Sequence, residues 1–146
     1  MIIAVGCDHA AYDYKQKLVA HLQALGHTVE DVGCHSTESV DYADYAKPVA
    51  QMVAAGKAQR GILLCHTGIG MSIAANKVNG IRCALCADGF AARLTREHND
   101  SNILAIGAGM IGYPLAQEIA EIWLATEFVG GRHLRRVNKI MDLEAR

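Results

Sequence analysis

The sequence has few of the features that mark a multidomain, membrane-bound or secreted protein. Its 146 residues include two prolines, Pro48 and Pro114, and no low-complexity stretch or charge block, so no linker is visible. No apolar run approaches the roughly 20 residues that span a bilayer, and the start, MIIAVGCDHA, has no basic segment or small-residue cleavage site. We therefore expect one domain over residues 1–146, located in the cytoplasm and without a membrane partner.

Neither sign of charge is in excess, and the cysteines do not form a disulfide framework. Fourteen basic residues against fifteen acidic ones give a formal net charge of −1, so nothing predicts a general attraction to nucleic acid. The five cysteines are odd in number and lie mostly in apolar runs, unlike those of a small secreted scaffold. We expect reduced thiols, and any anion-binding site must be local.

The sequence does contain an alternation of short β-rich runs and longer helical segments. The runs are Ile2–Gly6, His27–Val32, Gly61–Cys65, Ile81–Cys86 and Asn102–Ile106. Apolar residues recur at helical spacing between and after them, as in Leu18, Leu22 and Leu25, and in Leu115, Ile119, Ile122 and Trp123. The pattern predicts a doubly wound α/β sandwich around a parallel sheet, in which ligands bind at the carboxyl ends of the strands.

A carboxylate beside an imidazole follows the first predicted strand. Asp8 and His9 stand where polar side chains can reach a bound ligand. Equally, Asp8 could be a helix N-cap and His9 an ordinary surface residue. The pair by itself leaves both interpretations open.

A glycine-containing loop follows the third predicted strand and leads into a helical segment. In Cys65–Ser72, CHTGIGMS, the glycines allow close backbone approach, and successive amides at a helix start favour an oxyanion or a phosphate. Cys65 at the strand end would have its thiolate favoured there, as a proton-abstracting cysteine requires. The alternative is that Cys65 is a small buried hydrophobic residue.

Two weaker motifs favour other functions. Gly68-Ile69-Gly70 with Asp88 partly matches a dinucleotide fingerprint, but Ile73 stands at the third glycine position and the motif follows the third strand, not the first. Cys83 and Cys86 have C-x-x-C spacing, yet on a strand they face opposite sides, and no second pair completes a zinc site. We expect core packing for both cysteines and no metal.

Two polar segments in the second half of the chain are further candidates. His98 and Asn99 end a helical segment, where a histidine could serve as an acid or base or could simply favour the negative end of the helix dipole. Arg132, Arg135 and Arg136 share one face of the last helix, where guanidinium groups suit a phosphate, although a solvated basic face paired with acidic residues would look the same.

Together, these motifs resemble those of the type B ribose-5-phosphate isomerases, within the group that includes galactose- and allose-6-phosphate isomerases. The similarity extends over nearly the whole chain. It rests on Gly6–Ala10, Ser39–Tyr42, Gly61–Cys65, Thr67–Lys77, Gly80–Arg82, Arg96–Asp100 and Gly130–His133. The resemblance implies a Rossmann-like three-layer sandwich with a five-stranded parallel sheet, and a cofactor-free aldose–ketose isomerase.

The resemblance also implies catalytic roles. Cys65 would move a proton between C1 and C2 through a cis-enediolate, and His98, assisted by Thr67, would open the furanose ring. The oxyanion would be held by amides of the loop that comprises Gly68, Ile69, Gly70, Met71 and Ser72. These roles agree with the chemistry, because enolisation needs a base, donors for the enediolate charge and an acid.

Substrate binding would involve two subunits. Asn99, contributed with His98 by the neighbouring subunit of a homodimer, would orient the sugar, and the helix from about residue 131 would pack on that partner. The remaining contacts would be Asp8 to sugar hydroxyls, Tyr42 lining the pocket, and His9, Arg132 and Arg136 to the phosphate.

Two positions depart from the family pattern. The family usually has glycine where His66 stands, and usually a phosphate-binding arginine where Gly109 stands. We expect His66 to contact the substrate and the remaining cationic groups to compensate for Gly109.

The sequence therefore predicts the interconversion of ribose 5-phosphate and ribulose 5-phosphate. The same chemistry on galactose 6-phosphate, allose 6-phosphate or a free sugar is one alternative. A non-catalytic sensor of sugar phosphates or nucleotides is another. Dimers could also pair into tetramers.

Overall fold

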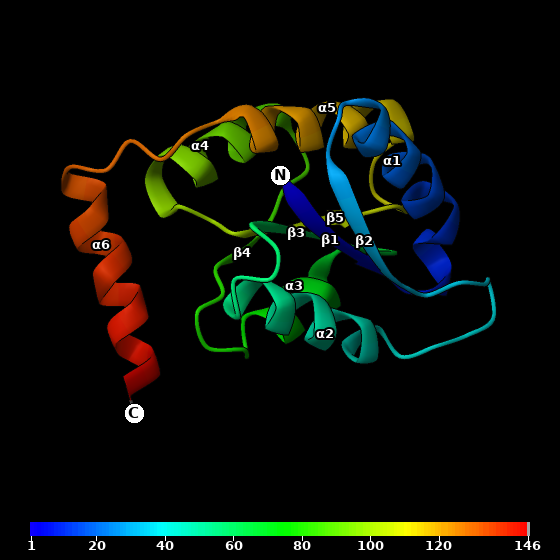
Figure 1. Ribbon diagram of the computed structural model, residues 1–146, viewed down its shortest axis with the longest axis horizontal. Helices are drawn as coiled ribbons and strands as arrows, with labels where there is room; N and C mark the ends of the chain where they lie inside the picture. Colours follow the sequence, from blue (N-terminus) through cyan, green and yellow to red (C-terminus); the bar gives the residue numbers. More distant parts are fainter. Residues whose placement is uncertain (146) are drawn as a thin grey trace.

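The computed structural model describes residues 1–145 as a parallel β-sheet between two layers of helices (Figure 1). The strands are β1 (Ile2–Cys7), β2 (Thr28–Gly33), β3 (Arg60–Cys65), β4 (Cys83–Leu85) and β5 (Ile103–Gly107). They pair in the order β2-β1-β3-β5-β4, and every pairing is parallel. The predicted fold class and all five predicted strands are confirmed.

The strand order places one switch point in the sheet. In the sheet, β2 lies on one side of β1 and β3 on the other. The connection after β1 runs toward β2, whereas the connection after β3 runs the opposite way, toward β4, so the two leave the carboxyl ends of β1 and β3 in opposite directions. A crevice forms at such a point in doubly wound sheets, and ligands bind there. Asp8 follows β1 directly and Cys65 ends β3, so both lie at this switch point.

The helices divide between the two faces of the sheet. They are α1 (Tyr12–Ala24), α2 (Tyr42–Ala54), α3 (Ile69–Ala75), α4 (Gly89–Asn99), α5 (Tyr113–Ala125) and α6 (Arg132–Met141), with 3₁₀ turns at His9–Ala11 and Asp142–Ala145. Side chains alternate along each strand: Ile3 and Val5 pack toward α1 and α5, whereas Ala4 packs toward α2 and α3. The sequence alternation thus produces two cores, one on each face.

Of the apolar residues predicted to face the core from the helices, four are buried, Leu115 and Ile122 are partly buried, and Leu25 is exposed. Leu18 and Leu22 of α1 and Ile119 and Trp123 of α5 have no exposed surface. The expectation fails for Leu25, whose side chain is 51% exposed, because α1 ends at Ala24 and Leu25 is only its C-cap.

Strand β4 is shorter than predicted, and Cys83 at its start and Cys86 just after its end face opposite cores, as the strand pattern required. Cys83 packs against the core beneath α2 and α3, and Cys86 belongs to the core beneath α1 and α5. The strand begins only at Cys83, whose backbone N–H donates to the Asn76 side chain at 2.8 Å and whose carbonyl accepts from it at 3.0 Å. An asparagine side chain thus covers the edge of the sheet.

Helix α6 stands at the side of the sandwich, next to α4 and away from the carboxyl ends of the strands (Figure 1). It buries His133 and Val137 but exposes nearly half of Leu134 and Ile140. Among residues 1–145, no helix combines the length and the apolar character that a membrane crossing requires.

Candidate active site

The site is centred on the thiol of Cys65, the last residue of β3. Its side chain is 4% exposed, and the backbone N–H of Gly68 donates a hydrogen bond to Sγ at 3.1 Å. A donor aimed at sulfur stabilises negative charge there. Gly68 makes this turn because its φ is +77° and because a Cβ would lie 2.5 Å from Leu85 Cδ1. Cys65 is therefore buried, as the alternative interpretation expected, but a donor is directed at its sulfur.

The loop after Cys65 has fewer free amides than the sequence predicted. The N–H of Ile69 donates to Thr67 Oγ1 at 3.2 Å, while those of Gly70 and Met71 find no acceptor among residues 1–145. The expectation of a free amide at Ser72 needs correction, because that amide donates to the Gly68 carbonyl at 3.0 Å. Helix α3 begins at Ile69, one turn earlier than a loop with free amides through Ser72 would require.

Asp8 and His9 lie beside Cys65 because β1 and β3 are neighbouring strands. Asp8 is 7% exposed, and its Oδ1 accepts from the N–H of Ala10 at 3.0 Å, so the N-cap role is real. His9 Nδ1 accepts from the Val40 amide at 3.1 Å. In the neutral ring the proton therefore lies on Nε2, which has no partner among residues 1–145.

Tyr42 reaches the loop from the start of α2. A Cβ on Gly70 would lie 2.7 Å from Cζ of the Tyr42 ring, so the ring packs directly on the Gly70 backbone. The side chain remains 46% exposed. A side chain at position 70 would meet the Tyr42 ring, so the space favours glycine there. Tyr42 forms a wall next to the free amides of Gly70 and Met71.

His66 and Gly109, the two positions that depart from the resembled pattern, are in contact. The Gly109 N–H donates to the His66 carbonyl at 2.7 Å. The imidazole lies over the Gly109 backbone: a Cβ there would collide with Cε1 and Nδ1 and lie 2.7 Å from Nε2. His66 is exposed, so the ring forms part of the rim of the site.

A second group of predicted residues lies elsewhere in the chain. His98 and Asn99 end α4, and the His98 ring stacks on His133 of α6 with centroids 4.2 Å apart and planes 10° from parallel. Arg132 and Arg136 are exposed nearby on α6. Within residues 1–145 neither arginine forms an ion pair, which removes the paired basic face as an explanation for these two.

The two groups do not meet within one chain. Cys65 pairs with Gly107 at the carboxyl end of β5, whereas Asn99 and Asp100 precede the amino end of that strand. From Ile103 to Gly107, β5 alone spans roughly 13 Å. The structure thus brings Asp8, His9, Tyr42 and the β3–α3 loop together around Cys65, and it places His98, Asn99, Arg132 and Arg136 at the other edge of the sheet.

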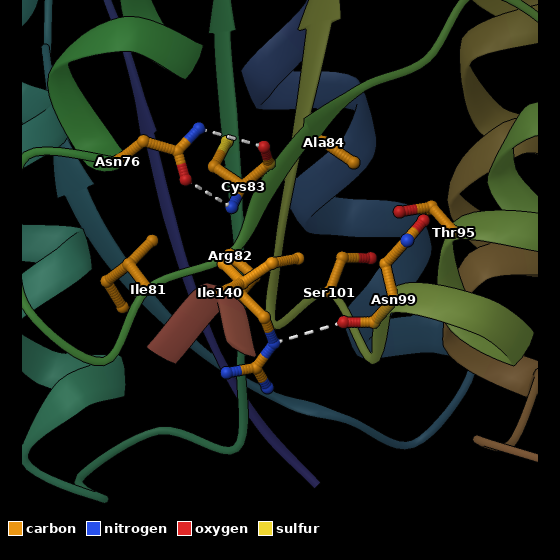
Figure 2. Close-up of a pocket in the computed structure, with 9 residues that line it drawn as sticks. All are labelled: Asn76, Ile81, Arg82, Cys83, Ala84, Thr95, Asn99, Ser101 and Ile140. Atoms are coloured by element: carbon orange, nitrogen blue, oxygen red, sulfur yellow. Dashed lines mark hydrogen bonds between the residues drawn. The ribbon is translucent and has the colours of Figure 1, made fainter. Parts of the chain in front are cut away.

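Two arginines to which the sequence reasoning gave no role hold the end of α4. Arg82 donates to the carbonyl of Asn99 at 3.1 Å (Figure 2) and to that of Asp100 at 2.8 and 3.1 Å. Arg96, 1% exposed, donates to Asp100 Oδ1 at 2.8 Å and to the Ser101 carbonyl at 2.6 Å. In the sequence, the only sign of this arrangement is that Arg96 and Asp100 are four residues apart, the spacing of neighbours on a helix surface. Asn99 also lines a cavity of about 270 Å³ beside Arg82, Cys83 and Ile140.

Burial shifts the pKa of three further thiols and of His133. Burial raises the pKa of Cys7 and Cys83 to about 12 and that of Cys86 to about 11, so these thiols stay protonated near neutrality. Burial and the neighbouring His98 and arginines lower the pKa of His133. Among residues 1–145, no three His, Cys, Asp or Glu side chains are grouped to hold a metal ion.

The fold and the Cys65 group define a class: doubly wound α/β proteins whose site is a cysteine and a glycine-containing loop at the switch point of the sheet. The sequence identifies the family within that class. A sequence model of the Ribose/Galactose Isomerase family matches residues 3–140, and the chain belongs to this family.

Individual relatives match almost end to end. Ribose-5-phosphate isomerase B of Escherichia coli is 47% identical over 144 residues, which cover 99% of this chain and 97% of the relative. D-erythrulose-4-phosphate isomerase of Pectobacterium atrosepticum is 48% identical, covering 94% and 91%. The structure of ribose-5-phosphate isomerase B of Clostridium thermocellum superposes with a TM-score of 0.98 at 49% identity, covering 99% and 98%.

Proposed function

We propose that this protein interconverts ribose 5-phosphate and ribulose 5-phosphate. The observation that carries the proposal is the Cys65 thiol at the switch point, with the Gly68 N–H on its sulfur, in a chain of the Ribose/Galactose Isomerase family. A base and oxyanion donors next to each other are what proton transfer alpha to a carbonyl requires.

In the proposed step the Cys65 thiolate removes the proton from C2 of the open-chain aldose. The C–H electron pair forms the C1–C2 double bond of the cis-enediolate, and the carbonyl electrons move onto O1. The free amides of Gly70 and Met71 then stabilise this oxyanion. The thiol returns its proton to C1 while the O2 proton passes to O1, which leaves a ketone at C2. The route uses no metal or cofactor.

The remaining site residues bind and orient the sugar phosphate. Asp8 holds sugar hydroxyls, His9 presents its free Nε2–H to the phosphate, and Tyr42 closes the wall beside Gly70. Before enolisation, His98 and Thr67 assist the opening of the furanose ring. A phosphate held away from the reacting carbons supplies binding energy that orients them.

A second copy of the chain completes the site. His98, Asn99, Arg132 and Arg136 lie at the far edge of the sheet from their own Cys65, so they serve the Cys65 group of a partner in a homodimer. The half-exposed Leu134 and Ile140 of α6 offer apolar surface for that partner.

Turnover of purified protein tests the proposal. Formation of ribulose 5-phosphate from ribose 5-phosphate is followed with a panel of other pentose and hexose phosphates and with free ribose, before and after exhaustive chelation. The expected result is preference for ribose 5-phosphate, with activity retained after chelation. Binding of ribose 5-phosphate without turnover would instead support the sensor alternative.

One comparison favours a second candidate substrate. A relative 48% identical over nearly the whole chain is named for D-erythrulose 4-phosphate, a shorter sugar phosphate. The same thiol and amides would catalyse that isomerisation on a shorter sugar, which needs no ring opening because its O4 is phosphorylated. The assay panel therefore includes erythrulose 4-phosphate, and the ratio of kcat/KM values assigns the substrate.

A further inference from the structure

We propose that His66 and Gly109 act as one unit, in which the His66 imidazole donates a hydrogen bond to the phosphate of the substrate. This inference rests on the proposed function for the substrate class, and it assigns a specificity-determining residue at the rim of that site.

The first support is the position of the ring. The two loops that carry the pair leave neighbouring strands, β3 and β5, and their backbones are joined by the bonds Ala108 N–H to Cys65 carbonyl at 2.8 Å and Gly109 N–H to His66 carbonyl at 2.7 Å. The imidazole is therefore attached to the same short turn as the reacting thiol.

The second support is the reason for glycine at position 109. Its φ is not in the left-handed region, so the backbone does not need glycine there. The space does, because any Cβ would collide with the His66 ring. Gly109 thus leaves room for the imidazole in this position, and a side chain at position 109 would displace the ring.

The third support is charge. The β3–α3 loop contains His66, Thr67 and Gly68, and the β5–α5 loop, residues 108–112, contains no ionisable side chain. His66 is exposed, and its ring nitrogens form no hydrogen bond among residues 1–145. A phosphate that reaches these two loops can form a charge-assisted hydrogen bond to a side chain only at His66.

A double-mutant cycle with two readouts tests the pairing. The variants are His66→Ala, Gly109→Ala and the double variant, with His21→Ala, a surface histidine of α1, as the control. The readouts are KM for ribose 5-phosphate and the dissociation constant of inorganic phosphate by calorimetry. We expect His66→Ala to raise both roughly 10- to 100-fold, with kcat nearly unchanged, since one charge-assisted bond is lost.

Gly109→Ala pushes the ring aside. With His66 present it should therefore raise both KM and the dissociation constant of phosphate, whereas in the His66→Ala background it should change neither. Three results would overturn the inference. They are an unchanged dissociation constant of phosphate in His66→Ala, a raised KM without a raised dissociation constant of phosphate, and equal effects of Gly109→Ala with and without His66. Phosphate calorimetry needs no turnover, so it tests the pair even if the wild-type protein fails to isomerise ribose 5-phosphate.

Discussion

At the scale of single residues, the five cysteines show how environment separates identical side chains. Cys7, Cys83 and Cys86 sit against apolar cores, where burial raises the pKa of each thiol well above its usual value. Cys65 is also buried, but a backbone N–H is directed at its sulfur. The turn at Gly68 provides this donor, and we expect Cys65 to be the reactive thiol.

Replacing Cys65 by alanine tests its role as the base. Loss of a positioned general base should lower kcat by roughly 10²- to 10⁴-fold, while the Tm stays near that of the wild type because little volume is removed at a strand end. Steady-state kinetics and thermal unfolding measure the two effects. Cys83→Ala is the matched control and should retain activity, and substantial turnover by folded Cys65→Ala would exclude the thiol as base.

At the scale of elements, the end of α4 is held by the arginines that enclose it. Asp100 adopts a left-handed conformation with φ of +47°, and the carbonyls around it accept from Arg82 and Arg96. Cations at a helix C-terminus also offset its dipole. His98 and Asn99 lie in this last turn, so both arginines are positioning residues for side chains proposed to reach a partner's site.

Arg82→Ala should therefore impair catalysis more than stability. A small displacement of positioning groups can cost about two orders of magnitude, so kcat/KM is expected to fall roughly 10- to 100-fold. Arg93→Ala, at an exposed position of α4, serves as the control and should change little. Kinetics alongside urea unfolding separate the effects; a loss of activity no larger than that of Arg93→Ala would contradict the positioning role.

At the scale of the whole molecule, the site is divided between two edges of one sheet. In a parallel sheet with helical crossovers, the carboxyl ends of the strands lie at one edge and the carboxyl ends of the helices at the other. Cys65 ends β3 and His98 lies in the last turn of α4, so the two side chains cannot meet within a chain. A second copy brings the two edges together without any change in the fold. Activity should then depend on association.

Mixing inactive subunits tests this division. Cys65→Ala and His98→Ala homodimers should each be nearly inactive, but a heterodimer would hold one site with both side chains intact. After subunit exchange verified by mass spectrometry, we expect about a quarter of wild-type activity, since half of the dimers are mixed and each has one working site. Absence of rescue would show that both residues act within one chain or on separate steps.

Stability should fall in alkali because of the buried thiols. Burial raises the pKa of Cys86 from 9.0 to about 11, so the unfolded chain loses this proton first and its release favours unfolding as pH rises from 9 to about 11. One such proton changes the free energy of unfolding by about 1.4 kcal/mol per pH unit. Denaturant unfolding across this range should show a shallower decline for Cys86→Ala than for wild type; identical slopes would contradict the shift.

Much of the molecule could be predicted from the sequence because local patterns control it. Alternation along strands, helical spacing and the position of polar residues after β1 and β3 are short-range features, and they predicted the parallel sheet and the group around Cys65. Errors arose at element ends: Leu25 falls just beyond α1, and Ser72 is already inside α3. Ends depend on caps and tertiary contacts that periodicity does not record.

The sequence by itself determined which residues could do the chemistry: one thiol at a strand end, a loop with glycines, and histidines and arginines placed after it. Only the tertiary structure decided which of them meet. It joined His66 to Gly109, enclosed the end of α4 with Arg82 and Arg96, and separated His98 from Cys65. The physical reason is that His66 and Gly109, Arg82 and Asn99, and Cys65 and His98 are 17 to 43 positions apart in the chain, and their distances are set by sheet order and packing rather than by local preference.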